Sequence, residues 1–442
     1  MKRLFLGFFV LLSVLGFPQT DTAQIVVPGR TNSVQALSKP YVILISADGF
    51  RHDYAKKYNA QNILKLAENG VSAKAVIPSY PSITGPNHYT MITGLYPSHT
   101  GFVDNYFYDK KRNDLFGMSL QSKISDGSWL GGTPLWSLAE QQGVLAASLF
   151  WVASNSDAGG TRPTYYYNYH EKFTADEKIN IVLNWLKLPE EKRPHFITFY
   201  FPEVDKNGHL YGSESLEVQN AVKFVDDAIG KLMDKVNQLQ LPNVNFIFVS
   251  DHGMIDVDVE STLEIPALLQ DKNRFIVNNA QTLLRITVKN EIEVNEVYRE
   301  LRRNKTGGYK VYLTEKFPRR LHYRTADDRF GRIGQILLVP DAPKIFLEPN
   351  ARKTPGKHGY NPFKVPKMKA SFAASGPAFK KGKKIGQFTN VNIYPMVAEI
   401  LGLEITESID GKSCTAKKVL KSKKNPAESA GFIYKVLSLY QQ

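Results

Sequence analysis

Apolar runs of strand length alternate with amphipathic helical segments along most of this chain, and this alternation is what most constrains its fold. A continuous apolar run lies at 41–45, and mostly apolar stretches that are predicted as strands lie at 144–152, 195–201 and 245–250. Strands that are apolar on both faces are typical of a sheet covered by helices. Helical segments are predicted at 53–69, 134–142, 175–186 and 216–239. Strands alternating with helices predict βαβ units and hence an α/β fold with a mostly parallel sheet flanked by helices.

The alternation breaks off between residues 262 and 345. Short β-like stretches at 282–289 and 334–339 lie there around a helix near 293–303. We expect this stretch to be a small inserted α+β subdomain. The core resumes at 371–375 and ends with a helix over 391–401, for which Asn390 is the predicted N-cap. The predicted domains are therefore a core, 40–261 and 346–442, and the insertion, 262–345.

The N-terminal residues have the pattern of a secretory signal peptide. Lys2 and Arg3 precede an apolar run over 4–17, and a polar stretch follows at 19–24. The pattern predicts a leader, residues 1–23, that is removed near Ala23, and the alternative is an uncleaved anchor. No later apolar run approaches the ~20 residues that a membrane-spanning helix needs, so no stable membrane span is expected after cleavage.

Cys414 is the only cysteine among the 442 residues. An intramolecular disulfide is therefore impossible, and no thiolate cluster can hold a metal. Export without disulfides favours a bacterial periplasm. Any metal must be bound by histidines and carboxylates.

The chain is basic, with 56 Lys and Arg against 42 Asp and Glu and a net charge of +14. Thirteen lysines and four acidic residues fall between 364 and 424. A basic stripe can bind polyanions, so one interpretation is a non-enzymatic polyanion-binding protein, and the other is a solvated lysine-rich surface. The lysines follow no recognisable nucleic-acid motif, and no specific nucleic-acid partner is expected.

Acidic residues and histidines gather where the predicted strands end. Asp48 follows the first run, Asp205 and His209 follow the third, and Asp251 and His252 follow the fourth. Ligands of open α/β sheets bind at the carboxyl ends of the strands, so these side chains are expected to converge. His358 lies in a glycine-flanked loop, 356–359, that can bend toward them. Three Asp and three His without cysteine suit two divalent ions, with zinc as the first choice.

Thr84 is the candidate nucleophile. It precedes Pro86 at the start of a predicted helix, where Thr suits the cap and Pro the first turn. A helix N-terminus offers free N–H groups and a positive dipole end to an anion. A hydroxyl there beside a metal can attack phosphorus, and the alternative is that Thr84 is only a cap.

Four motifs occur in a characteristic order along the chain. They are Pro-Asn-His-Tyr-Thr…Thr-Gly-Leu-Tyr-Pro at 86–97, Asp-Asn at 104–105, Asp-x-x-x-His at 205–209 and Asp-His-Gly-Met at 251–254. With them the chain resembles the nucleotide pyrophosphatase/phosphodiesterases of the alkaline phosphatase superfamily, in a secreted bacterial form, over roughly residues 40–405. The segment 391–403 is similar to the closing helix of that superfamily. The resemblance implies an alkaline-phosphatase-like fold and a metal-dependent phosphoric diester hydrolase.

The resemblance also implies roles for individual residues. Two Zn²⁺ ions are implied, one held by Asp205, His209 and His358 and the other by Asp48, Asp251, His252 and the hydroxyl of Thr84. Asn105 matches the residue that holds a phosphate oxygen, and Tyr200 matches an aromatic side chain of the substrate pocket. Two metals ~3.5–4 Å apart can clamp an in-line phosphoryl displacement, here with a phosphothreonine intermediate on Thr84. The expected partner is a small-molecule phosphodiester or a nucleotide.

Gly85 departs from the family pattern. Members that cleave nucleotides commonly have Phe after the nucleophile, where it packs on the base, so nucleotide preference is open. Nearby aromatic residues that can fill the gap are Tyr106, Phe107, Tyr165, Tyr166 and Tyr167. The alternative substrates are a phospholipid-type diester and a phosphomonoester, and Arg162 is the one candidate cation for the extra charge of a monoester.

Overall fold

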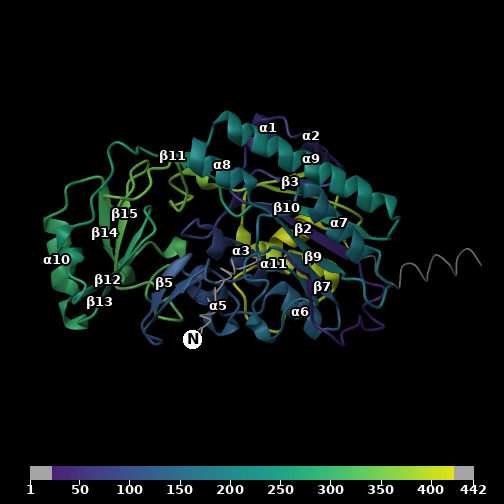
Figure 1. Ribbon diagram of the computed structural model, residues 1–442, viewed down its shortest axis with the longest axis horizontal. Helices are drawn as coiled ribbons and strands as arrows, with labels where there is room; N and C mark the ends of the chain where they lie inside the picture. The colour runs from purple at the N-terminus through teal and green to yellow at the C-terminus, as the bar shows by residue number, and fades with distance from the viewer. Residues whose placement is uncertain (1–21, 423–442) are drawn as a thin grey trace, which may run out of the picture.

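A nine-stranded sheet forms the centre of the molecule in the computed structural model, which describes residues 22–422 (Figure 1). Its strands, in spatial order, are β1 (Ile25–Val26), β8 (Tyr165–Tyr166), β7 (Ala146–Leu149), β9 (Phe196–Phe201), β2 (Tyr41–Ala47), β10 (Val244–Val249), β17 (Phe372–Ser375), β3 (Val71–Ala73) and β18 (Lys383–Ile385). The strands from β8 to β10 in this order run parallel to one another. They are the predicted parallel core.

The rest of the sheet is mixed, which the sequence pattern did not predict. β17 runs antiparallel to both β10 and β3, and β1 runs antiparallel to β8. The chain leaves β10 at its carboxyl end and returns to β17 from the same edge, after the insertion. A strand that starts where its neighbour ends must run in the opposite direction, so this connection needs no helical crossover.

Helices cover both faces of the sheet. They are α1 (Tyr54–Lys57), α2 (Gln61–Asn69), α3 (Thr84–Thr93), α4 (Pro97–Thr100), α5 (Gln121–Ile124), α6 (Leu135–Gln141), α7 (Ala175–Leu186), α8 (Glu203–Tyr211), α9 (Leu216–Gln238), α11 (Ile393–Leu401) and α12 (Cys414–Val419). Val42 and Leu44 of β2 pack in one core with α3, α6 and α11, while Ile43 and Ile45 pack in the other with α2, α7 and α9. This is the alternation expected of a strand buried on both faces, and Figure 1 shows α9 and α6 on opposite sides of the sheet.

Most predicted helices keep their bounds. α7 matches 175–186 residue for residue, since Thr174 and Glu177 form a capping box. The predicted helix 53–69 is wrong as one element: it divides into α1 and α2, because Asn59 adopts a left-handed conformation with φ of 55°. Asn390 does not cap α11. It begins a short 3₁₀ turn, Asn390–Asn392, that precedes the helix.

A second, four-stranded antiparallel sheet lies beside the large one, at the left of Figure 1. Its order is β12 (Phe275–Asn279), β13 (Leu284–Val288), β15 (Ile336–Pro340) and β14 (Tyr309–Leu313), and α10 (Val294–Arg303) packs against it in a separate hydrophobic core. The sequence predicted β13, β15 and α10 but missed β12 and β14. The division of the chain at 262 and 345 stays a prediction, which this separate core supports.

Three two-stranded sheets complete the strands of the described residues. They are β4 (Val76–Ile77) with β19 (Phe388–Thr389), β5 (Tyr106–Asp109) with β6 (Asp114–Gly117), and β11 (Ile255–Asp256) with β16 (Gly356–Lys357). The predicted leader, 1–23, lies almost entirely outside the described residues. Within 22–422 no helix is both long and apolar enough to cross a membrane.

Candidate active site

The ends of the two central strands bring three predicted ligands together. Asp48 follows β2, and Asp251 and His252 follow β10, which lies beside β2 in parallel. The Nε2 atom of His252 lies 3.0 Å from Asp251 Oδ2 and 3.5 Å from Asp48 Oδ1. All three side chains are buried. They form one group of possible metal ligands.

The other three predicted ligands come from a helix and a loop. Asp205 and His209 lie one turn apart on α8 rather than at a strand end, because the helix begins directly after β9. The pairing of β11 with β16 brings His358 to them. His358 Nε2 lies 3.0 Å from His209 Nε2 and 3.6 Å from Asp205 Oδ1. The six predicted ligands therefore form two adjoining groups, and the rings of His252 and His358 stack at 3.7 Å between them.

The tightest group around Asp205 differs from the predicted set in one member. The ligand atoms of Asp205, His252 and His358 all lie within 4.8 Å of one another. His209 touches His358 but is not part of this group. His252 thus faces both groups of ligands.

Each of these imidazoles has its Nδ1 atom against a backbone carbonyl oxygen. The pairs are His209 with Gly356 at 2.8 Å, His358 with Ser82 at 2.9 Å and His252 with Gly253 at 3.0 Å. A carbonyl only accepts, so Nδ1 carries a hydrogen in each ring, and in the neutral form of the ring Nε2 carries a lone pair. The lone pairs of His209 and His358 then face each other, an arrangement that a cation between them would stabilise. Metal-binding histidines are oriented in this way by their second nitrogen.

The ionised carboxylates of Asp48, Asp205 and Asp251 lie close together, so a nearby positive charge would stabilise them. Burial raises the pKa of Asp48 well above its ordinary value, and the neighbouring carboxylates of Asp251 and Asp205 add to this effect. Burial would also raise the pKa of Asp251, but His252 and His88 outweigh it and lower that pKa. Asp205 Oδ1 is buried without a hydrogen-bond partner in the described part of the chain. These oxygen and nitrogen donors fit divalent metal ions.

Thr84 points into this cluster rather than capping its helix. Ile83 is the N-cap of α3, no side chain caps the helix, and Thr84 is its first residue. Thr84 Oγ1 lies 3.2 Å from His252 Nε2 and 3.5 Å from Asp48 Oδ1. The prediction that Thr84 caps the helix is wrong, and its hydroxyl lies among the candidate metal-ligating atoms.

His88 is a residue of this site that the sequence reasoning missed. It lies one turn after Thr84 on α3, with Nδ1 3.0 Å from the carbonyl oxygen of Thr84 and Nε2 2.8 Å from Ser46 Oγ. It is buried, and its Nδ1 also lies 3.4 Å from Asp251 Oδ2. The spacing of four residues from Thr84 was the available signal, because such residues share a helix face.

Asn105 lies directly beside the candidate nucleophile, Thr84. Its Oδ1 atom accepts a hydrogen bond from the backbone N–H of Gly85 at 2.8 Å. This leaves the amide NH₂ group of Asn105 available to a ligand next to Thr84.

A hollow of about 270 Å³ opens beside Thr84. Its lining residues, Thr84, Met118, Ser119, Gln121, Ile124, Phe150, Trp151, Val152, Ala153, Ser154, Asn155, Tyr167, Tyr169 and Tyr200, carry no charged side chain. The hydroxyl of Tyr200 also donates to Asp48 Oδ2 at 2.6 Å, so this residue joins the hollow to the carboxylates. Of the five aromatic residues considered for the gap at Gly85, only Tyr167 lines it.

Arg162 lies elsewhere. Its guanidinium donates to the carbonyl oxygens of Asn155 at 2.8 Å and Ser125 at 3.0 Å and pairs with Asp157 at 3.4 Å. These contacts hold loops together. The candidate cation for a monoester is therefore a structural residue.

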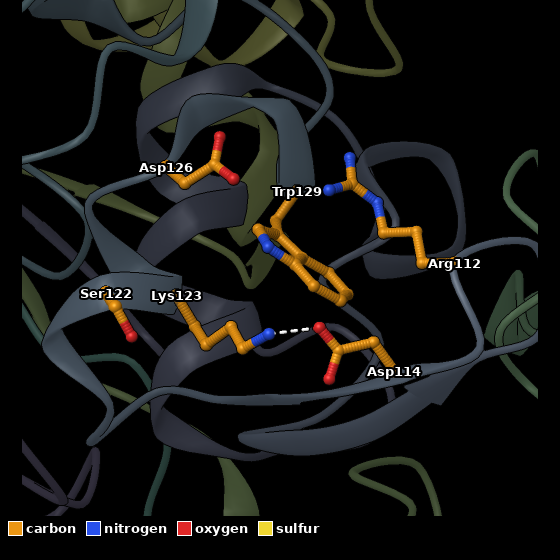
Figure 2. Close-up of a pocket in the computed structure, with 6 residues that line it drawn as sticks. All are labelled: Arg112, Asp114, Ser122, Lys123, Asp126 and Trp129. Atoms are coloured by element: carbon orange, nitrogen blue, oxygen red, sulfur yellow. Dashed lines mark hydrogen bonds and ion pairs between the residues drawn. The ribbon is translucent and has the colours of Figure 1, made fainter.

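A second hollow, of about 440 Å³, is lined by charged side chains and does not include Thr84 or the ligand residues. Figure 2 shows Lys123 paired with Asp114, and Arg112 lies over the ring of Trp129, 4.3 Å from its centre. These charges are already partnered by one another and by the ring. The hollow beside Thr84, which adjoins the candidate metal ligands, is therefore the candidate substrate site.

Gly85 has no room for a side chain. A Cβ atom there would lie 2.6 Å from Asn105 Oδ1, 2.6 Å from Phe102 Cζ and 2.9 Å from Met118 Sδ. Its φ is not in the left-handed region, so the requirement is close approach rather than backbone conformation. The position faces Asn105, not open space that a Phe could fill.

We therefore expect Gly85→Ala and Gly85→Phe to lower kcat/KM on both a nucleotide diester and a small aryl diester. Overpacking of this kind costs roughly 1–3 kcal/mol, which corresponds to a loss of about 5- to 150-fold. Gly386→Ala is the matched control, because nothing lies within 4 Å of a Cβ there. A selective gain of Gly85→Phe on the nucleotide would contradict this expectation.

Fold and site together define an alkaline-phosphatase-like α/β protein with a hydroxyl among candidate metal ligands at the carboxyl edge of its sheet. The chain belongs to the type I phosphodiesterase / nucleotide pyrophosphatase family, whose model matches residues 42–361. Both the predicted fold class and the family resemblance are thereby confirmed.

Several known proteins are similar to this chain. Rat ectonucleotide pyrophosphatase/phosphodiesterase family member 3 is 35% identical over 383 residues, which cover 84% of this chain and 43% of that protein. Human family member 1 is 34% identical over 377 residues, with 82% and 40% covered. The chain thus spans less than half the length of these curated relatives.

The solved structures match this chain over a larger share of their own length than the curated relatives do. Murine ectonucleotide pyrophosphatase/phosphodiesterase 5 superposes with a TM-score of 0.78 at 27% identity and covers 86% of this chain and 100% of that one. An inactive threonine-to-alanine variant of the same murine protein, in complex with AMP, has a TM-score of 0.78 at 26% identity and the same coverage.

Proposed function

We propose that this chain is a two-zinc phosphodiesterase or nucleotide pyrophosphatase that hydrolyses phosphodiester or phosphoanhydride bonds through a phosphothreonine intermediate on Thr84. The observation that carries the proposal is the position of the Thr84 hydroxyl, 3.2 Å from His252 Nε2 and 3.5 Å from Asp48 Oδ1 at the start of α3. Zinc, when bound, supplies positive charge that lowers the pKa of a coordinated hydroxyl and offsets charge on phosphate oxygens.

The proposed ligand sets are those that the resemblance implies. One ion takes Asp205, His209 and His358, and the other takes Asp48, Asp251, His252 and Thr84. The carbonyl contacts of the three histidines support these sets, because they present Nε2 to the cluster.

In the proposed reaction, Thr84 Oγ1 attacks phosphorus, the new O–P bond forms, and the bond to the leaving oxygen breaks. Water then cleaves the phosphothreonine and restores the hydroxyl, so one difficult step becomes two easier ones. Few backbone donors remain for the phosphate oxygens, because Pro86 has no N–H and the N–H of Gly85 donates to Asn105. The amide of Asn105 is therefore the main protein donor in this proposal.

The uncharged hollow beside Thr84 supports a diester substrate. A monoester carries an additional negative charge, and no cationic side chain lines the hollow to hold it. Trp151 and Tyr167 offer aromatic surface, and Asn155 and Ser154 offer hydrogen bonds, to a nucleoside or another aromatic group. The murine neighbour in complex with AMP supports a nucleotide over a lipid diester.

Rates on two synthetic esters test this substrate class. We expect kcat/KM on bis-(p-nitrophenyl) phosphate to exceed that on p-nitrophenyl phosphate by at least about tenfold. This ratio corresponds to ~1.4 kcal/mol of free energy, the expected cost of the additional negative charge of the monoester. Measurements on a dinucleotide and on a glycerophosphodiester then separate nucleotide from lipid-type substrates. A faster rate on the monoester would contradict the proposal.

We also propose that the protein is secreted, into a bacterial periplasm. The pattern of residues 1–23 and the absence of a possible disulfide in the sequence support this location. The names of the relatives, ectonucleotide enzymes and venom phosphodiesterases, agree with export in general.

A further inference from the structure

We propose that the inserted segment is a clamp that positions Asn105, acting through Arg285, Tyr323 and Arg332. The inference rests on the proposed function, in which Asn105 holds a phosphate oxygen. In this proposal the second sheet, through Arg285 on β13, and the loop between β14 and β15, through Tyr323 and Arg332, hold the segment that carries Asn105. In this assignment the three clamp residues are positioning residues, since none of them lines the hollow beside Thr84.

The segment that they hold, residues 101–106, carries Asn105 and is irregular up to Asn105 itself. Irregular backbone has carbonyl groups that no strand or helix ladder satisfies, so other donors must fix it. On one side, the amide of Met118 donates to the Asn105 carbonyl at 2.8 Å. Three further carbonyl oxygens of the segment accept hydrogen bonds from the inserted segment, some 180 to 230 residues further along the chain.

Three side chains of that segment donate to carbonyl oxygens on either side of Asn105. Arg332 Nη1 donates to Gly101 at 3.0 Å, the Tyr323 hydroxyl donates to Val103 at 2.9 Å, and Arg285 Nη2 donates to Tyr106 at 2.6 Å. Arg285 Nη2 also pairs with the carboxylate of Asp104 at 3.0 Å. The single guanidinium of Arg285 therefore binds both residues next to Asn105, namely Asp104 and Tyr106.

The clamp residues are buried and connected to one another. Arg285, Tyr323 and Arg332 are at most 3% exposed. Arg285 Nη1 donates to the carbonyl oxygen of Arg332 at 3.4 Å, and Arg332 pairs with Asp109 at 2.7 Å. Buried ion pairs are poor stabilisers compared with apolar packing, whereas the planar fork of arginine fixes the geometry of the groups that it binds. Fixing geometry is what a donor of hydrogen bonds to a transition state requires.

From the clamp, the contacts continue to the nucleophile. Asn105 Oδ1 accepts from the N–H of Gly85, the residue after Thr84. A shift of the 101–106 segment would move the amide of Asn105 relative to the Thr84 hydroxyl. Loss of a clamp contact should therefore lower kcat and leave the KM of an aryl diester nearly unchanged.

Tyr323→Phe tests the clamp with the least disturbance, because it removes one hydroxyl and keeps the buried ring. We expect kcat on bis-(p-nitrophenyl) phosphate to fall about two- to tenfold, the range of one lost internal hydrogen bond. Tyr309→Phe is the matched control: this tyrosine is also buried in the inserted segment but makes no hydrogen bond through its hydroxyl among the described residues, and its kcat should be unchanged. Arg285→Lys, which keeps the charge but not the fork, should lower kcat at least as much as Tyr323→Phe.

The same substitutions in an Asn105→Ala background separate positioning from general damage. With the amide gone, Tyr323→Phe should change kcat by less than about 1.5-fold, because the two residues act as one unit. An equal loss in both backgrounds, or unchanged kcat in the otherwise unaltered enzyme, would overturn the clamp while leaving the proposed function intact. Unchanged kcat in Asn105→Ala alone would instead contradict the proposed role of Asn105, and the clamp with it.

Discussion

Thr84→Ala is expected to abolish turnover while leaving metal binding largely intact. The variant removes the only hydroxyl that lies within 3.5 Å of both His252 and Asp48 in the described cluster, and with it the proposed acceptor of the phosphoryl group. Loss of a covalent nucleophile lowers kcat by on the order of 10³-fold or more. Six candidate ligands remain, so the zinc content, measured by elemental analysis beside kcat, should stay close to that of the unaltered enzyme.

Two matched variants make this result specific. Thr84→Ser keeps a hydroxyl and should retain measurable turnover. Thr93→Ala removes a buried threonine hydroxyl at the end of the same helix, where it donates to the carbonyl of Tyr89, and should change kcat little. If Thr84→Ala kept even a tenth of the original kcat, covalent catalysis by Thr84 would be ruled out.

The sequence predicted the strand-end part of the site because short-range patterns determine it. Apolar runs located β2 and β10, and parallel neighbours end at a common edge, so Asp48, Asp251 and His252 had to meet. Asp205 and His209 were predicted to join them although their element was mistaken, since α8 starts so close to the end of β9. His358 was predicted only from its glycine-flanked loop, and its approach to the other ligands depends on the pairing of β11 with β16, which no short-range pattern encodes.

Contacts between distant parts of the chain could not be predicted, because no local sequence pattern encodes them. The crowding at Gly85 depends on Phe102, Asn105 and Met118, whose packing no periodicity encodes. The direction of β17 depends on how the chain returns from the insertion. β12 and β14 are short and half exposed, so they lacked the continuous apolar run that located the central strands.

Removal of metal is expected to inactivate the enzyme reversibly. The donors fit a cation, because burial and the neighbouring carboxylates raise the pKa of Asp48, and two Nε2 atoms lie 3.0 Å apart. A bound cation stabilises both arrangements. Because metal ions contribute several kcal/mol to phosphoryl transfer, a chelator should reduce kcat/KM to below about one per cent. Titration of the stripped protein with Zn²⁺ should restore activity with about two ions per chain. Full activity after complete stripping would contradict a metal-dependent mechanism.

Asp205→Asn and His358→Ala test whether these two residues serve one ion. Their ligand atoms are 3.6 Å apart, and each also lies near His209. If one ion is lost in either variant, little remains for the second substitution to remove. Should each variant lower kcat/KM by about 100-fold, the double variant should also lower it by about 100-fold, far from the roughly 10⁴-fold expected of independent sites.

Zinc content should fall by about one ion in all three variants, whereas Asp48→Asn should lower the occupancy of the other ion. Strict additivity of the two effects on the logarithm of kcat/KM would mean that Asp205 and His358 hold different ions, and the proposed ligand sets would have to be exchanged around His252, which faces both.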